Sequence, residues 1–273
     1  MHPEDRTPMN RAFPLFADAG PVRAVLLREF RDALINRYFQ VFAALSLLGG
    51  VAAIIFSEDA NSVPVFILQA ALYFVSLFAL LAGASSAQAE RDEWEMLFTQ
   101  PVPRAAYVVG KFIAYLSIFA AVLLLLFLPG LAGGSSHLAI LYCQTLLLAA
   151  VFLALGLTAG FLAHDRAQAL IAGVSAWLLL LFGVDFIALF AARWELVQKF
   201  PDLWVSFLML NPLDSFRIEA LFSLEQIPAE AANKTPLASW WIAHAAVWFS
   251  FIAAIWSAAL IALSGLRLSR WEN

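Results

Sequence analysis

The chain has 273 residues, of which 63% are hydrophobic and only 13% are charged. Soluble domains have about 45–50% apolar and about 25% charged residues, so this composition excludes an ordinary soluble domain. The small net charge of −4 does not point to nucleic acid, and we expect an all-α integral membrane protein surrounded by a lipid bilayer.

The first predicted unit, residues 1–37, is a cytoplasmic N-terminal segment. Within residues 22–37, apolar side chains recur at helical spacing, and arginines occupy much of the remaining surface. This pattern is typical of an amphipathic helix that lies in the membrane interface.

The second unit, residues 38–273, is predicted to contain six transmembrane helices. Each candidate is an apolar run of roughly 20 residues, the length that crosses a bilayer. Lipid offers no hydrogen bonds to the backbone, so each run is expected to be a helix. The predicted spans cover residues 38–56, 64–83, 112–130, 138–162, 170–191 and 240–263.

The distribution of basic residues predicts that both termini are cytoplasmic. Cytoplasmic loops carry an excess of lysine and arginine. With the N-terminus inside, twelve of the sixteen basic residues are cytoplasmic: Arg6, Arg11, Arg23, Arg28, Arg31, Arg37, Arg91, Arg104, Lys111, Arg166, Arg267 and Arg270. The first two external loops contain none.

Residues 90–104 form a cytoplasmic loop with an unusual order of side chains. An acidic cluster is followed by an apolar patch and then by Pro101 and Pro103, which end any helix. The segment is either a plain charged turn or a short amphipathic docking helix. The docking candidates are Glu90, Arg91, Glu93, Trp94, Glu95, Met96, Leu97 and Arg104.

Asp185 lies within the fifth predicted span. A charged carboxylate at the centre of a membrane helix costs roughly 2.5–3.5 kcal/mol on insertion scales. We therefore expect Asp185 to be buried in the bundle, paired or protonated. Counting along the span places it in the outer half, within reach of Arg193 or Arg217. It either forms a structural pair or takes part in a substrate or proton path.

An external segment, residues 192–239, is rich in aromatics and is expected to form short helices at the outer interface. Within it, Asn211 suits a helix N-cap and Pro212 the first helical position. Asp214 favours the positive helix end, and Arg217 can pair with it at i+3. The motif is either a well-capped helix start or a fixed contact with an external partner.

Nothing in the sequence predicts a catalytic or metal centre in this chain. The histidines are not at ligand spacing, Cys143 is the only cysteine, and no G-x-x-x-x-G-K-[ST] phosphate-binding sequence is present. We expect the chain itself to bind no cofactor and not to be an enzyme.

The loop resembles that of ABC-2 type permeases, the membrane subunits of ABC transporters. The resemblance rests on Glu90-Arg91, on Gln100-Pro101-Val102-Pro103-Arg104 and on Gly110-Lys111-Phe112. It implies a type V exporter-like fold in which this loop is the coupling helix. It also implies a second copy of the chain and two copies of a separate cytoplasmic ATPase, which binds ATP and Mg²⁺.

A narrower resemblance is to NosY-type permeases, which serve the maturation of nitrous oxide reductase, a copper enzyme. It rests on Asn211-Pro212-Leu213-Asp214-Ser215-Phe216-Arg217, on Val184-Asp185-Phe186 and on His164-Asp165-Arg166. The resemblance implies a bacterial inner-membrane location and a NosD-like periplasmic partner.

Three other functions compete with this one. The chain could be a generic ABC-2 exporter of a lipid, polysaccharide or drug. A secondary transporter is expected to show inverted repeats and interrupted helices, and neither is evident in the sequence. An intramembrane enzyme needs a second catalytic group beside Asp185, and the sequence offers no obvious one.

Overall fold

The computed structural model describes residues 27–31, 35–57, 62–89, 91, 104–131, 136–191, 193–224 and 236–269. Within these ranges the chain is almost entirely helical and contains no strand. Six helices are long and apolar enough to cross a membrane, which confirms the predicted number. They cover Arg37–Ile55, Ser62–Ala89, Arg104–Gly130, Leu138–Leu162, Arg166–Ala191 and Ala243–Ser269.

Two of the six spans are built from several helical segments, and the described residues between the fifth and the sixth span include three short helices. In chain order, the segments are α2 (Arg37–Ile55), α3 (Ser62–Ala70), η1 (Ala71–Val75), α4 (Ser76–Ala89), α6 (Arg104–Leu131), α7 (Ser136–Leu162), α8 (Arg166–Leu178), η3 (Leu179–Gly183), α9 (Val184–Ala191), α10 (Glu195–Lys199), α11 (Pro201–Leu208), α12 (Pro212–Ser223) and α14 (Pro236–Ser269).

Side-chain caps set where two of the spans begin. The Asn36 side chain accepts a hydrogen bond of 2.9 Å from the Tyr38 amide at the start of α2. The Asp165 side chain accepts one of 2.7 Å from the Gln168 amide at the start of α8. Each cap satisfies a backbone donor that has no partner within the helix.

The predicted N-terminal interfacial helix is only partly described. Residues 27–31 are helical, whereas residues 1–26 and 32–34 lie outside the described part of the chain. Arg37, expected at the end of that helix, is instead the first residue of α2. The reason is the extended backbone of Asn36, with φ −68° and ψ 121°, which starts a new helix there.

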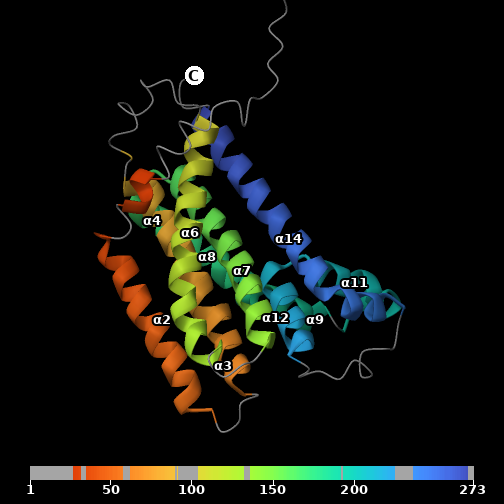
Figure 1. The fold of residues 1–273 in the computed structure, drawn as a ribbon. Coiled ribbons are helices and arrows are strands. Elements are labelled where there is room, and N and C mark those ends of the chain that lie inside the picture. The colour runs from red at the N-terminus through yellow and green to blue at the C-terminus, as the bar shows by residue number, and fades with distance from the viewer. Residues whose placement is uncertain are drawn as a thin grey trace, which may run out of the picture.

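Helix α7 lies at the centre of the bundle and packs against α4, α6, α8 and α14, while α2 packs against α6 (Figure 1). Small residues bring α4 and α7 close together. A Cβ on Gly83 would lie 2.5 Å from the Leu153 carbonyl oxygen, and one on Gly156 would overlap the Leu80 carbonyl. Close backbone approach at small residues is the usual way in which membrane helices pack.

Two spans contain a π turn, η1 in the second and η3 in the fifth. The Trp177 indole, just before η3, donates a hydrogen bond of 2.9 Å to the Ser76 hydroxyl, just after η1. This hydrogen bond therefore joins the second span to the fifth, close to the π turn in each. Helix α14 is also irregular, because His244 has non-helical angles (φ −124°, ψ 19°).

The bundle has two ends, which we call proximal and distal. At the proximal end, α4, α7 and α14 end and α6 and α8 begin, and the last described residue, Ser269, lies there (Figure 1). At the distal end, α11 and α12 lie beside α9 and the start of α14 (Figure 1), and α10 contacts α11. The segment 192–239 thus contains short helices, as expected. The sequence predicts that the proximal end faces the cytoplasm.

Candidate functional site

The start of α12, at the distal end, carries a network of polar contacts. Asn211 caps this helix by accepting a hydrogen bond of 3.2 Å from the Leu213 amide, and Pro212 is the first helical residue. Both roles match the sequence-based interpretation. Asn211 is only 5% exposed, so the cap lies inside the bundle and not at its surface.

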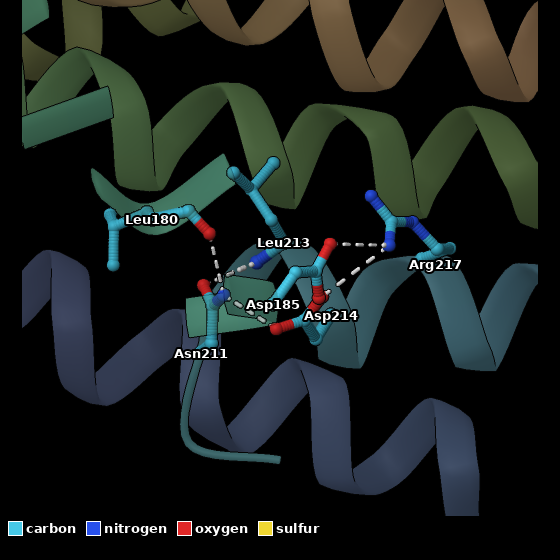
Figure 2. A network of polar contacts seen from close by, with 6 residues as sticks. All are labelled: Leu180, Asp185, Asn211, Leu213, Asp214 and Arg217. Atoms are coloured by element: carbon cyan, nitrogen blue, oxygen red, sulfur yellow. Dashed lines mark hydrogen bonds and ion pairs between the residues drawn. The ribbon is translucent and has the colours of Figure 1, made fainter. Parts of the chain in front are cut away.

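The Asn211 amide joins α12 to the fifth span (Figure 2). Its Nδ2 donates to the Leu180 carbonyl at 2.8 Å and to the Asp214 carboxylate at 2.6 Å. Leu180 belongs to η3, where the π turn changes the direction of the backbone carbonyls. The irregular turn thus presents a backbone acceptor to a side chain on another helix.

Arg217 lies between two carboxylates, one on its own helix and one on α9 (Figure 2). Its Nη1 is 3.5 Å from Asp185 Oδ2 and 3.7 Å from Asp214 Oδ1. The predicted reach of Arg217 to Asp185 is therefore seen. Of the three expected states of Asp185, buried, paired or protonated, the structure shows the paired one, and the side chain is 51% exposed. The fifth span lies at the edge of the bundle, and Asp185 faces partly outward.

Burial raises the pKa of Asp214 above its ordinary value, and the nearby Asp185 raises it further. The Asn211 hydrogen bond and the Arg217 charge act in the opposite direction. The desolvation of a carboxylate is thus only partly offset by its two partners. Asp214 lies on α12, outside the six candidate spans.

Helix α14 holds the other side of the same segment. The Trp248 and Trp256 indoles donate hydrogen bonds of 3.1 Å and 3.0 Å to the Met209 and Leu210 carbonyls, just before the Asn211 cap. The Phe216 ring also packs against Phe249 of α14, with centroids 5.4 Å apart. The start of α12 is therefore fixed between the fifth and sixth spans.

The sequence interpretation missed a second buried carboxyl group on α12. Glu219 is 2% exposed, and its Oε2 has no hydrogen-bond partner in the described structure. The Gln144 side chain of α7 hydrogen-bonds to it, and Gln144 is itself 4% exposed. A signal was present, because Glu219 follows Ser215 and Phe216 at the i+4 and i+3 spacing of one helix face.

At the proximal end, arginines at both ends of the 90–104 loop bind the ends of other spans. Arg91 Nη1 donates to the Ala163 carbonyl, just after α7, at 2.6 Å. Arg104 Nη1 donates to the Leu268 carbonyl, in the last turn of α14, at 2.7 Å. These side chains, predicted as docking residues, thus contact carbonyls at helix C-termini, which favour cations.

Six further docking candidates lie outside the described residues: Glu90, Glu93, Trp94, Glu95, Met96 and Leu97.

An ion pair that the sequence interpretation missed lies close to this end. Lys111 Nζ is 2.8 Å from Glu29 Oε1, and the Lys111 and Glu29 side chains are only 1% and 3% exposed. It connects the N-terminal helical residues 27–31 to α6.

The contacts at both ends hold helices together. Within the described ranges, no three His, Cys, Asp or Glu side chains are grouped so that they could hold a metal ion.

No protein-family model matches the chain, and no curated protein matches its sequence significantly. The function must therefore be argued from the sequence pattern and from these contacts.

Proposed function

We propose that the chain is the membrane-spanning permease subunit of an ABC transporter of the ABC-2 type. In this proposal, a separate cytoplasmic ATPase binds residues 90–104, and ATP hydrolysis changes the position of this loop. Two copies of the chain and two ATPase subunits form the machine. The chain itself carries no ATPase activity and transmits the motion across the membrane.

The observation that carries the proposal is the attachment of the loop at both of its ends. Arg91 binds the end of α7, the central helix, and Arg104 binds the end of α14. The Gln88 amide adds a hydrogen bond of 2.6 Å to the Gly160 carbonyl of α7. A displacement of the loop is thus passed to the fourth and sixth spans as well as to α4 and α6, which it connects.

The distal end is the proposed output. Asn211 and Arg217 join α12 to the fifth span, and two tryptophans join the segment before α12 to α14. Relative motion of the fifth and sixth spans would therefore displace α12. In the NosY-like form of the proposal, this displacement acts on a NosD-like periplasmic partner during copper-site maturation. In the generic form, it moves a lipid, polysaccharide or drug.

The proposal is tested by capture of the tagged chain from membranes, with bound proteins identified by mass spectrometry. We expect an ABC ATPase to co-purify and the complex to hydrolyse ATP. The variant Glu93→Lys with Glu95→Lys reverses two loop charges and should abolish both. The matched control, Glu195→Lys, reverses a side chain that is 84% exposed at the distal end and should leave both intact.

Two results would count against the proposal. One is a wild-type chain that is folded and captured without any ABC ATPase. The other is loss of the ATPase in the Glu195→Lys control to the same extent as in the loop variant, because docking would then not depend on residues 90–104. Co-purification of a periplasmic protein with wild-type chain, but not with Arg217→Gln, would favour the maturation role over generic export.

A further inference from the structure

The interface between α12 and α7 contains two buried oxygen acceptors without a donor. These are Glu219 Oε2 and Gln144 Oε1, and neither has a hydrogen-bond partner in the described structure. The two residues are 2% and 4% exposed, so water does not reach them freely. Buried polar groups without partners are rare and destabilise a fold, so these two call for an explanation.

The same two side chains are already in contact. The Gln144 side chain hydrogen-bonds to the Glu219 carboxyl, and the Ser223 hydroxyl makes a second such bond. An ionised carboxylate can only accept hydrogen bonds, so it cannot satisfy the Gln144 oxygen. A protonated carboxyl group gains one O–H donor. One proton on Oε2 would therefore turn two unsatisfied acceptors into one donor–acceptor pair.

We infer that Glu219 and Gln144 form a proton-binding site, in which the Gln144 amide donates to the Glu219 carboxyl and the protonated Glu219 Oε2 donates back to Gln144 Oε1. The proton comes from water and returns to water when the pair separates. This inference goes beyond the proposed function and does not depend on an ATPase partner.

The electrostatic surroundings agree with a neutral acid. Burial raises the pKa of Glu219 from its ordinary value of 4.5 to about 7, although the hydrogen bonds from Gln144 and Ser223 lower it. Helix α12 packs against α7, α14 and η3. The titratable or charged residues with described side chains on these elements and on α12 itself are Tyr142, Cys143, His244, Arg267, Asp214 and Arg217. None of these six contributes to the raised pKa of Glu219, so no cation among the described residues compensates the buried carboxylate.

The position of the Gln144–Glu219 pair means that binding of the proton affects the contact between α7 and α12. Gln144 lies on the central helix α7, about 12 Å from the distal start of that helix at 1.5 Å per residue. Glu219 lies on α12, which is joined to the fifth and sixth spans. Binding of the proton holds α12 against α7, whereas loss of the proton leaves a buried charge at their interface and favours separation.

The test uses infrared difference spectroscopy of the full-length protein in lipid nanodiscs, titrated between about pH 5 and 9 across the expected carboxyl range. We expect a carbonyl band of a protonated carboxylic acid that disappears with a midpoint near the value of 7 given above. The Glu219→Gln variant should lack this band. The control Glu195→Gln removes an exposed glutamate and should retain it.

A second variant keeps the test decisive if Glu219→Gln fails to fold. Gln144→Leu removes both the amide donor to the carboxylate and the acceptor of the Oε2 proton, so the midpoint should move from its wild-type value. The inference is overturned if the band is absent from the wild type, persists in Glu219→Gln, or keeps its midpoint in Gln144→Leu. It is also overturned if sodium, in place of choline, lowers the midpoint, because the oxygens would then form a metal-cation site.

Discussion

Lys111 and Glu29 form an ion pair of 2.8 Å in which both side chains are almost completely buried. The Lys111 ammonium also lies 5.5 Å and 5.9 Å from the ring centroids of Tyr107 and Tyr115, within the range of cation–π attraction. The pair joins helical residues 27–31 to the helix that follows the 90–104 loop. Displacement of that loop would therefore reach the N-terminal segment as well.

The first prediction concerns this pair. Lys111→Met leaves the Glu29 carboxylate buried without its cation and should lower the free energy of unfolding by about 3–5 kcal/mol. The double variant Lys111→Met with Glu29→Gln removes both charges and should recover much of that loss. Thermal unfolding in detergent provides the measurement. Equal destabilisation by the single and double variants would contradict a role for the ion pair.

The second prediction concerns the contact between α4 and α7. Gly156→Ala places a methyl group against the Leu80 carbonyl and should force the two helices apart. Gly265→Ala is the matched control, because a Cβ there meets nothing within 4 Å. It should leave the protein unchanged or stabilise it by up to about 1 kcal/mol through helix propensity. The midpoints of thermal unfolding of both variants test the contrast.

The third prediction compares two helix caps. Asn36→Ala removes an exposed cap on α2 and should cost about 1 kcal/mol. Asn211→Ala removes a buried cap and also takes the Asn211 amide donor from the Leu180 carbonyl and the Asp214 carboxylate, so about 1–3 kcal/mol should be added. Chemical denaturation of the two variants measures the difference. Equal effects would show that the contact with η3 contributes nothing.

The fourth prediction separates the two carboxylates around Arg217. Asp185→Asn should change the free energy of unfolding by less than about 1 kcal/mol, because exposed ion pairs contribute little. Arg217→Gln should be more damaging, since it also removes the cation from the buried Asp214. Unchanged transport activity in a folded Asp185→Asn variant would exclude this residue from a substrate or proton path.

The fifth prediction concerns pH. The Glu219 pKa is higher in the folded chain than its ordinary value, so the folded state binds the proton more tightly than the unfolded state. Stability contributed by this group is therefore present at low pH and is lost as the pH rises from 4.5 to about 7. The loss is on the order of 3 kcal/mol.

Glu219→Gln stays neutral throughout this range. We expect this variant to unfold at a higher temperature than the wild type at about pH 8, where the wild-type carboxylate is charged. The difference should shrink at low pH. Glu195→Gln serves as the control and should follow the wild type at every pH, because this side chain is 84% exposed. A wild type whose midpoint ignores pH would contradict the assignment.

The spans and the α12 cap were predictable because each follows from a local pattern. Apolar runs of membrane length define the six helices. The Asn211, Pro212 and Arg217 roles depend on spacings of one to six residues. The reach of Arg217 to Asp185 was also foreseen, since both belong to the outer end of the bundle.

Contacts between distant segments were not predictable in the same way. The pairs formed by Glu29 with Lys111 and by Gln144 with Glu219 each join residues 75 or more positions apart. Hydropathy also gave no indication of which spans are central, so it did not show that the span of Asp185 lies at the edge of the bundle. The π turns leave no mark in an apolar run, because every residue within it suits either kind of helix.

The π turn in the fifth span determines where this span can lose a single residue. A π turn accommodates one more residue than a regular turn, while the helix on either side keeps its orientation. Deleting one residue within Leu179–Gly183 should therefore yield a regular helix in which Asp185 still faces Arg217. Deleting a residue from α8 would instead rotate the preceding part of the span by about 100° relative to Asp185. Among its described residues, this span can therefore be shortened by one residue only within η3 without rotating Asp185 relative to the rest of the span.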